Sequence, residues 1–133
     1  MSLARRLTLG LWAGMLICVG AIVAPLLFAT LEDRHLAGAL AARLFRVVAC
    51  VSLGAALLVA LMQPATVAGG LRRRLVPLLP AGLLLLASFA LHPRAGGEGV
   101  AFPLWHGLAT GLYVLATAGV LALWLADERR TPR

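Results

Sequence analysis

The chain has 133 residues, of which 62% are hydrophobic and 13% are charged, and its net charge is +7. A soluble domain carries about twice that charged fraction, so the composition excludes an ordinary water-soluble surface and predicts one membrane domain. All twelve basic residues are Arg, in short clusters between long uncharged runs, which is typical of membrane flanks and not of a nucleic-acid-binding face.

The first apolar run extends from Leu7 to Leu31 without a charged residue. A helix of about 20 apolar residues crosses a bilayer, so we expect a transmembrane helix over residues 8–30. A signal peptide is disfavoured because its apolar core is only about 7–15 residues long. Pro25 removes one backbone hydrogen bond and predicts a kink near the outer end of this span.

The second span is predicted over residues 44–63, within a longer helix that begins after Asp33 as its N-cap. The third run, residues 75–91, is short, and Pro77 and Pro80 fall in its first turns, where proline is tolerated.

The fourth span is predicted over residues 104–125. The stretches that separate the last three spans are Gly-rich and charged, which favours loops. The expected fold is therefore an all-α, four-transmembrane-helix bundle that forms a single integral membrane domain over residues 1–133.

The distribution of Arg residues predicts the orientation, because cytoplasmic loops carry an excess of positive charge. With the N-terminus inside, the cytoplasmic side holds eight of them: Arg5, Arg6, Arg72, Arg73, Arg74, Arg129, Arg130 and Arg133. The other side holds four, which are Arg34, Arg43, Arg46 and Arg94. We expect the N-terminus and the C-terminus to be cytoplasmic. The predicted location is the cell membrane, which is the inner membrane in a Gram-negative bacterium.

Small residues are spaced for close helix packing. Residues 10–14 and 107–111 are GxxxG motifs, and Gly38 is a further small residue in the second helix. We interpret them as packing faces within one bundle, with a dimer face as the alternative. Cys18 and Cys50 lie in apolar runs and are expected as small hydrophobic residues in helix interfaces.

Chemistry-bearing residues are scarce in the predicted spans, since none holds Asp, Glu, Lys or Arg at its centre. Ion pumps keep such groups inside the membrane, so ion-coupled transport is disfavoured. No nucleophile with its base, phosphate loop or carboxylate pair is recognisable, and we expect neither an enzyme nor a cofactor.

Three histidines, His35, His92 and His106, are predicted on the outer side, near Glu32, Asp33 and Glu98. Imidazole and carboxylate together bind divalent metals, which makes the histidines weak metal candidates. Their spacing is not a ligand motif, and an interfacial or packing role is favoured. Tyr113 follows His106 by two turns near the middle of the membrane, where its hydroxyl needs a partner, either the backbone or Thr110.

The stretch from Val23 to Phe45 resembles the transmembrane-protein-205-like family, which is also filed as a domain of unknown function. The residues that carry the resemblance are Ala24, Pro25, Phe28, Gly38, Leu44 and Phe45, and towards the C-terminus His106, Gly107 and Tyr113. Some members have Ser where this chain has Ala109. The resemblance implies a four-helix membrane protein without an agreed activity, and it makes Pro25, Phe28, Gly38, Phe45, His106, Gly107 and Tyr113 the candidate functional residues.

These observations favour a non-enzymatic interaction or accessory component of the membrane. The alternative is a small transporter or metal-handling protein that uses the outer histidines. The bilayer is the first expected partner. A second copy of the chain and another membrane protein both stay open as further partners, and nucleic acid is not expected.

Overall fold

The computed structural model describes residues 3–63, 70–91 and 102–129, and every regular element in these ranges is helical. The elements in chain order are α1 (Leu3–Cys18), η1 (Val19–Val23), α2 (Ala24–Thr30), α3 (Arg34–Leu61), α4 (Gly70–Leu75), α5 (Leu78–Leu85), η2 (Leu86–Leu91) and α7 (Phe102–Glu128), where η denotes a π-helix. This is the all-α fold that the sequence predicts.

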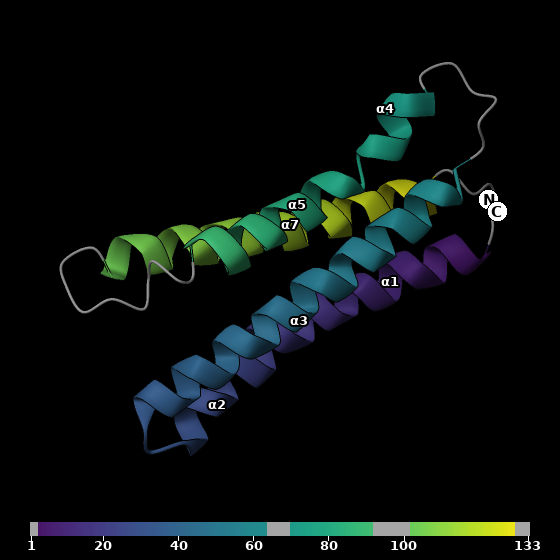
Figure 1. The fold of residues 1–133 in the computed structure, drawn as a ribbon. Coiled ribbons are helices and arrows are strands. Elements are labelled where there is room, and N and C mark those ends of the chain that lie inside the picture. The colour runs from purple at the N-terminus through teal and green to yellow at the C-terminus, as the bar shows by residue number, and fades with distance from the viewer. Residues whose placement is uncertain (1–2, 64–69, 92–101, 130–133) are drawn as a thin grey trace.

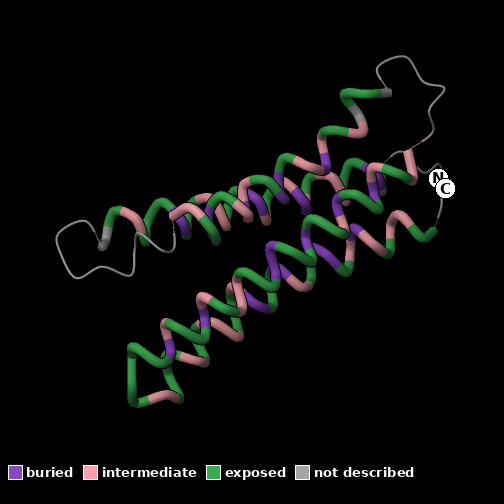
Figure 2. The backbone as a smooth tube through the Cα atoms, viewed as in Figure 1, coloured by how far each residue is buried: buried purple, intermediate pink, exposed green. Residues whose placement is uncertain are grey.

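The helices form two antiparallel hairpins, one of α1–η1–α2 with α3 and the other of α5–η2 with α7 (Figure 1). The hairpins contact each other through α1 with α7 and through α3 with α5 and η2. They lie close together where α1 begins and α7 ends, and they diverge towards the opposite end (Figure 1). Buried positions are most frequent in the half of the bundle where the two hairpins lie close together (Figure 2).

Asp33 defines the start of α3. Its carboxylate accepts hydrogen bonds from the backbone N–H groups of His35 at 2.8 Å and Leu36 at 3.2 Å. These amides have no partner within the helix, so the side chain satisfies them. The N-cap predicted from the sequence is confirmed, and the helix then runs without interruption to Leu61.

Pro25 follows a π-helical segment. Proline has no N–H group, so it cannot donate to the carbonyl of Ala21 as a residue in a regular helix would. The preceding segment, Val19–Val23, widens instead, and the N–H of Ala24 donates to the carbonyl of Val19 five residues earlier. A wide π-helical turn therefore precedes Pro25 and leads into α2, and a kink of the helix axis stays a prediction.

A buried hydrogen bond links α1 to α3. The indole N–H of Trp12 donates to the hydroxyl of Ser52 at 2.9 Å, and both residues are almost fully buried. An unpaired indole or hydroxyl in an apolar core costs free energy, which this bond avoids. Trp12 therefore belongs to the buried core between the helices.

Three helical stretches are long and apolar enough to cross a membrane, namely Leu3–Thr30, Arg34–Leu61 and Leu104–Glu128. The chain is therefore a membrane protein by length and composition of its helices. The apolar stretch Leu78–Leu91 has 14 residues, about 21 Å at the rise of a helix, which is less than the bilayer core of about 30 Å. A fourth crossing here stays a prediction.

Most glycines of the GxxxG motifs have no packing partner among the described residues, contrary to our expectation. Apart from the backbone of its own helix and its chain neighbours, no described atom lies within 4 Å of a Cβ built at Gly14, Gly38, Gly107 or Gly111, whereas a Cβ at Gly10 would lie 3.5 Å from Trp124. The helices contact one another through other residues. On α7, for example, the buried residues are Ala109, Ala116 and Val120. Cys18 and Cys50 are exposed, so their predicted place in helix interfaces is also wrong.

Candidate functional site

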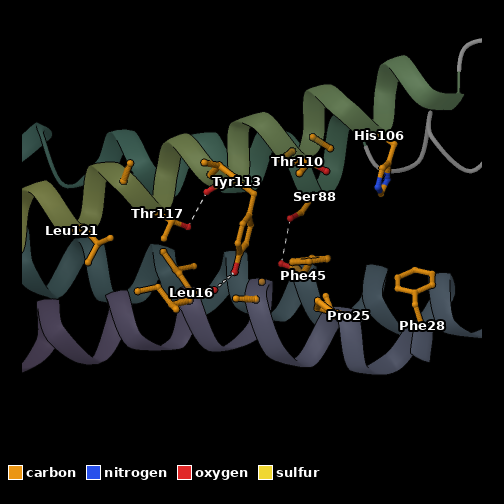
Figure 3. Close-up of a pocket in the computed structure, with 18 residues that line it drawn as sticks. Leu16, Pro25, Phe28, Phe45, Ser88, His106, Thr110, Tyr113, Thr117 and Leu121 are labelled. Carbon is orange, nitrogen blue, oxygen red and sulfur yellow. Dashed lines mark hydrogen bonds between the residues drawn. The ribbon is translucent and has the colours of Figure 1, made fainter. Parts of the chain in front are cut away.

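A cleft of about 620 Å³ lies between the two hairpins (Figure 3). Leu16, Gly20 and Pro25 are part of one wall, which α1, η1 and α2 form. The opposite wall is a face of α7 that extends from His106 to Leu121. Phe45 of α3 and Ser88 of η2 complete the lining. The cleft therefore occupies the space that opens where the hairpins diverge.

Tyr113 bridges the two walls of the cleft (Figure 3). Its hydroxyl donates to the backbone carbonyl of Leu16 at 2.7 Å, and its ring meets the ring of Phe45 edge-on, with centroids 5.1 Å apart and planes at 72°. The edge-on geometry is one that aromatic pairs prefer. Of the two hydrogen-bond partners considered from the sequence, the structure shows the backbone.

Gly20 makes this bridge possible. A Cβ at residue 20 would lie 2.7 Å from Cε1 of Tyr113, well inside the contact distance of two carbon atoms. The absence of a side chain lets the ring of Tyr113 lie against the backbone of η1. The π-helical segment and the tyrosine of α7 therefore meet at a glycine.

The polar groups around the middle of the cleft are engaged within the protein. The hydroxyl of Ser88 donates to the carbonyl of Phe45 at 3.3 Å, and the hydroxyl of Thr117 donates to the carbonyl of Tyr113 at 2.9 Å. The hydroxyl proton of Tyr113 is also donated within the protein, to the carbonyl of Leu16. The walls therefore expose mainly apolar groups to the cleft. His106 and Thr110, both on exposed positions of α7, add polarity at the end where the hairpins diverge.

Charged residues join the two hairpins beyond the apolar end of the cleft and do not line it. Arg5 pairs with Asp127 at 3.5 Å, and both side chains are largely buried. Arg6 pairs with Glu128 beside them. These ion pairs join the first turns of α1 to the last turn of α7, so the hairpins cannot separate there without breaking them.

The lining is suited to binding an apolar molecule. None of the described residues around the cleft is Asp, Glu, Lys, Arg or Cys. Apolar clefts with a few polar groups are typical of sites for lipophilic ligands.

Five of the seven candidate residues taken from the family resemblance line this cleft: Pro25, Phe28, Phe45, His106 and Tyr113. His106 and Phe28 approach the cleft from opposite walls (Figure 3). Gly38 and Gly107 are not part of it. Gly20, Leu16 and Ser88 were not predicted. Gly20 precedes Pro25 by five residues, and a glycine there is visible in the sequence, but nothing in the sequence pairs Gly20 with Tyr113.

Two of the three histidines lie among the described residues, and they are on different helices. His35 lies in the first turn of α3, His106 lines the cleft, and His92 lies outside the described residues. Within residues 3–63, 70–91 and 102–129, no three His, Cys, Asp or Glu side chains are close enough together to hold a metal ion.

Comparison with known proteins gives one family match. The family described as "Domain of unknown function (DUF4149)" matches residues 7–97. The matched range contains Pro25, Phe28, Gly38 and Phe45, whereas His106, Gly107 and Tyr113 follow it. No curated protein and no solved structure matches the chain.

Proposed function

The chain belongs to the DUF4149 family, and we propose that it is a non-enzymatic interaction or accessory component of the cell membrane that acts by binding a lipophilic partner in its cleft. The observation that carries this proposal is the convergence of Pro25, Phe28, Phe45, His106 and Tyr113 on one apolar cavity. These residues come from three separate elements, which are α2, α3 and α7.

The proposal includes the membrane arrangement that the Arg distribution predicts. Both ends of the chain are cytoplasmic, the stretch Leu78–Leu91 provides the fourth crossing, and the membrane is the inner one in a Gram-negative bacterium. The ion pairs between α1 and α7 support a shared side for both ends. The closer relation to the transmembrane-protein-205-like family is also part of this proposal and rests on the residues that match its pattern.

Photo-crosslinking tests the cleft as a binding site. Val114 lines the cleft and is 61% exposed, and the next residue, Leu115, is 59% exposed and outside the lining. We replace each in turn with p-benzoylphenylalanine in the full-length protein and irradiate intact membranes. One adduct of defined mass from position 114 and none from position 115 is the expected result. Equal, diffuse labelling from both positions would refute the proposal.

The alternative is a metal-handling or transport function that uses the outer histidines. It depends on His106, which is exposed at the end of the cleft where the hairpins diverge. Titration of the purified protein with copper and zinc, with His106→Ala alongside, tests it. A stoichiometric metal that the variant does not bind would place this function ahead of the first.

A further inference from the structure

The shape of the cleft is that of a long, narrow trough. Leu121 lies 15 positions after His106 on the α7 wall, which is about 22 Å along the helix. Half of the bilayer core is about 15 Å, so the α7 wall of the cleft is longer than one leaflet of that core is thick. Its volume of about 620 Å³ is spread along this length.

The cleft opens sideways. Ile17 and Ala21 on one wall, and Val114 and Ala118 on the other, are exposed while lining it. All four lie within the apolar stretches Leu3–Thr30 and Leu104–Glu128, which are long enough to span the membrane. A molecule dissolved in the bilayer can therefore enter between α1 and α7 without passing through water.

Polarity changes along the trough. The inner end is lined by Leu16, Ile17, Ala118 and Leu121, all apolar. The other end has the imidazole of His106 and the hydroxyl of Thr110. An occupant matched to both ends has a hydrocarbon tail and one polar head.

We propose that the occupant is a single hydrocarbon chain of an amphipathic membrane lipid, inserted from the side with its polar head beside His106 and Thr110 and its chain end near Leu121. This inference rests on the proposed function and names the class of molecule that the cleft binds. Apolar burial supplies the attraction along the chain, and polar contacts at one end fix its direction.

A transmembrane helix of a partner does not match the cleft. A helix about 10 Å wide occupies about 420 Å³ per turn, so the cavity has room for about one and a half turns. A transmembrane helix has about 20 residues, or more than five turns. A lipid chain is narrow enough to follow the whole trough.

The test uses the full-length purified protein in phosphatidylcholine–phosphatidylglycerol vesicles with a trace of phosphatidylcholine that carries a diazirine at one chain end. We expect the label to concentrate on the α7 peptide around Ala118 and Leu121. Leu53 and Leu57, exposed at a comparable position along α3, report labelling by bulk lipid. A probe with the diazirine next to the head should instead label the turn of His106 and Thr110.

Two variants fill the cleft from opposite walls, Ala118→Trp and Ala21→Phe. The matched control is Ala122→Trp, because Ala122 is also exposed on α7, one turn further along, and does not line the cleft. Labelling of the α7 peptide should fall to the α3 level in either cleft-filling variant and persist in the control. A variant is compared with the wild type only if its circular dichroism spectrum and its elution volume in size-exclusion chromatography match those of the wild type. Because the two substitutions lie on different walls, the test still holds if one of the variants does not fold.

Equal labelling of the cleft and α3, or labelling unchanged by both cleft-filling variants, would overturn the lipid assignment. If position 114 nevertheless crosslinks to one identified protein, the proposed function stands and the occupant is a protein segment. If neither experiment finds an occupant, both proposals fail.

Discussion

Gly20 and Gly14 lie on the same continuous helical stretch and differ in their surroundings. A Cβ at Gly20 would lie 2.7 Å from the ring of Tyr113, whereas among the described residues no atom approaches a Cβ at Gly14 within 4 Å. The sequence indicated that Tyr113 needs a hydrogen-bond partner, since a buried hydroxyl is costly alone. It could not identify Leu16 or Gly20, because both contacts cross about 95 residues of chain and depend on how the hairpins meet.

Gly20→Ala should destabilise the protein by about 1–3 kcal/mol, the usual cost of overpacking. Gly14→Ala should be neutral or stabilising by up to about 1 kcal/mol, because alanine favours a helix over glycine. Equilibrium unfolding in mixed detergent–SDS micelles measures both. The penalty at residue 20 should shrink in a Tyr113→Leu background, where the opposing ring is gone. Equal effects at residues 14 and 20 would contradict the close contact.

Element boundaries were predictable where a local signal sets them. Asp33 caps α3 with its own side chain, so its sequence neighbours suffice to place the start. The fourth span was predicted over residues 104–125, and the helix that contains it continues to Glu128. The physical reason is non-local, since Asp127 and Glu128 meet Arg5 and Arg6 at the start of α1.

Asp127→Asn should weaken the junction of α1 and α7 strongly. The change leaves the largely buried guanidinium of Arg5 without its carboxylate, and breaking a buried pair from one side costs about 3 kcal/mol. Glu128→Gln is the matched control and should cost much less, because its pair with Arg6 is more exposed to solvent. Thermal unfolding in detergent compares the two. A Glu128→Gln loss as large as that of Asp127→Asn would contradict the role assigned to burial.

At the scale of the whole molecule, the composition predicted a helical membrane protein, since an apolar chain with few charges has few other folds available. The cleft was not predictable, because its walls come from segments far apart in the chain, and the hydrogen bond of Tyr113 to Leu16 joins them across that distance. Pro25, Phe28, Phe45, His106 and Tyr113 could be selected as candidates from family resemblance, but not assembled into a cavity.

Orientation is the property of the whole molecule that the charges should control. Changing Arg72, Arg73 and Arg74 together to Gln lowers the predicted inside count from eight to five, against four outside. Because the excess of inside Arg directs insertion, a reporter fused at the C-terminus should change from one orientation to a mixture. The control variant carries Arg43→Gln and Arg46→Gln, which lowers the outside count to two and should leave the C-terminus inside. A single, unchanged orientation in the triple variant would mean that the first span alone directs insertion, and the charge of α4 would then have no part in setting the topology.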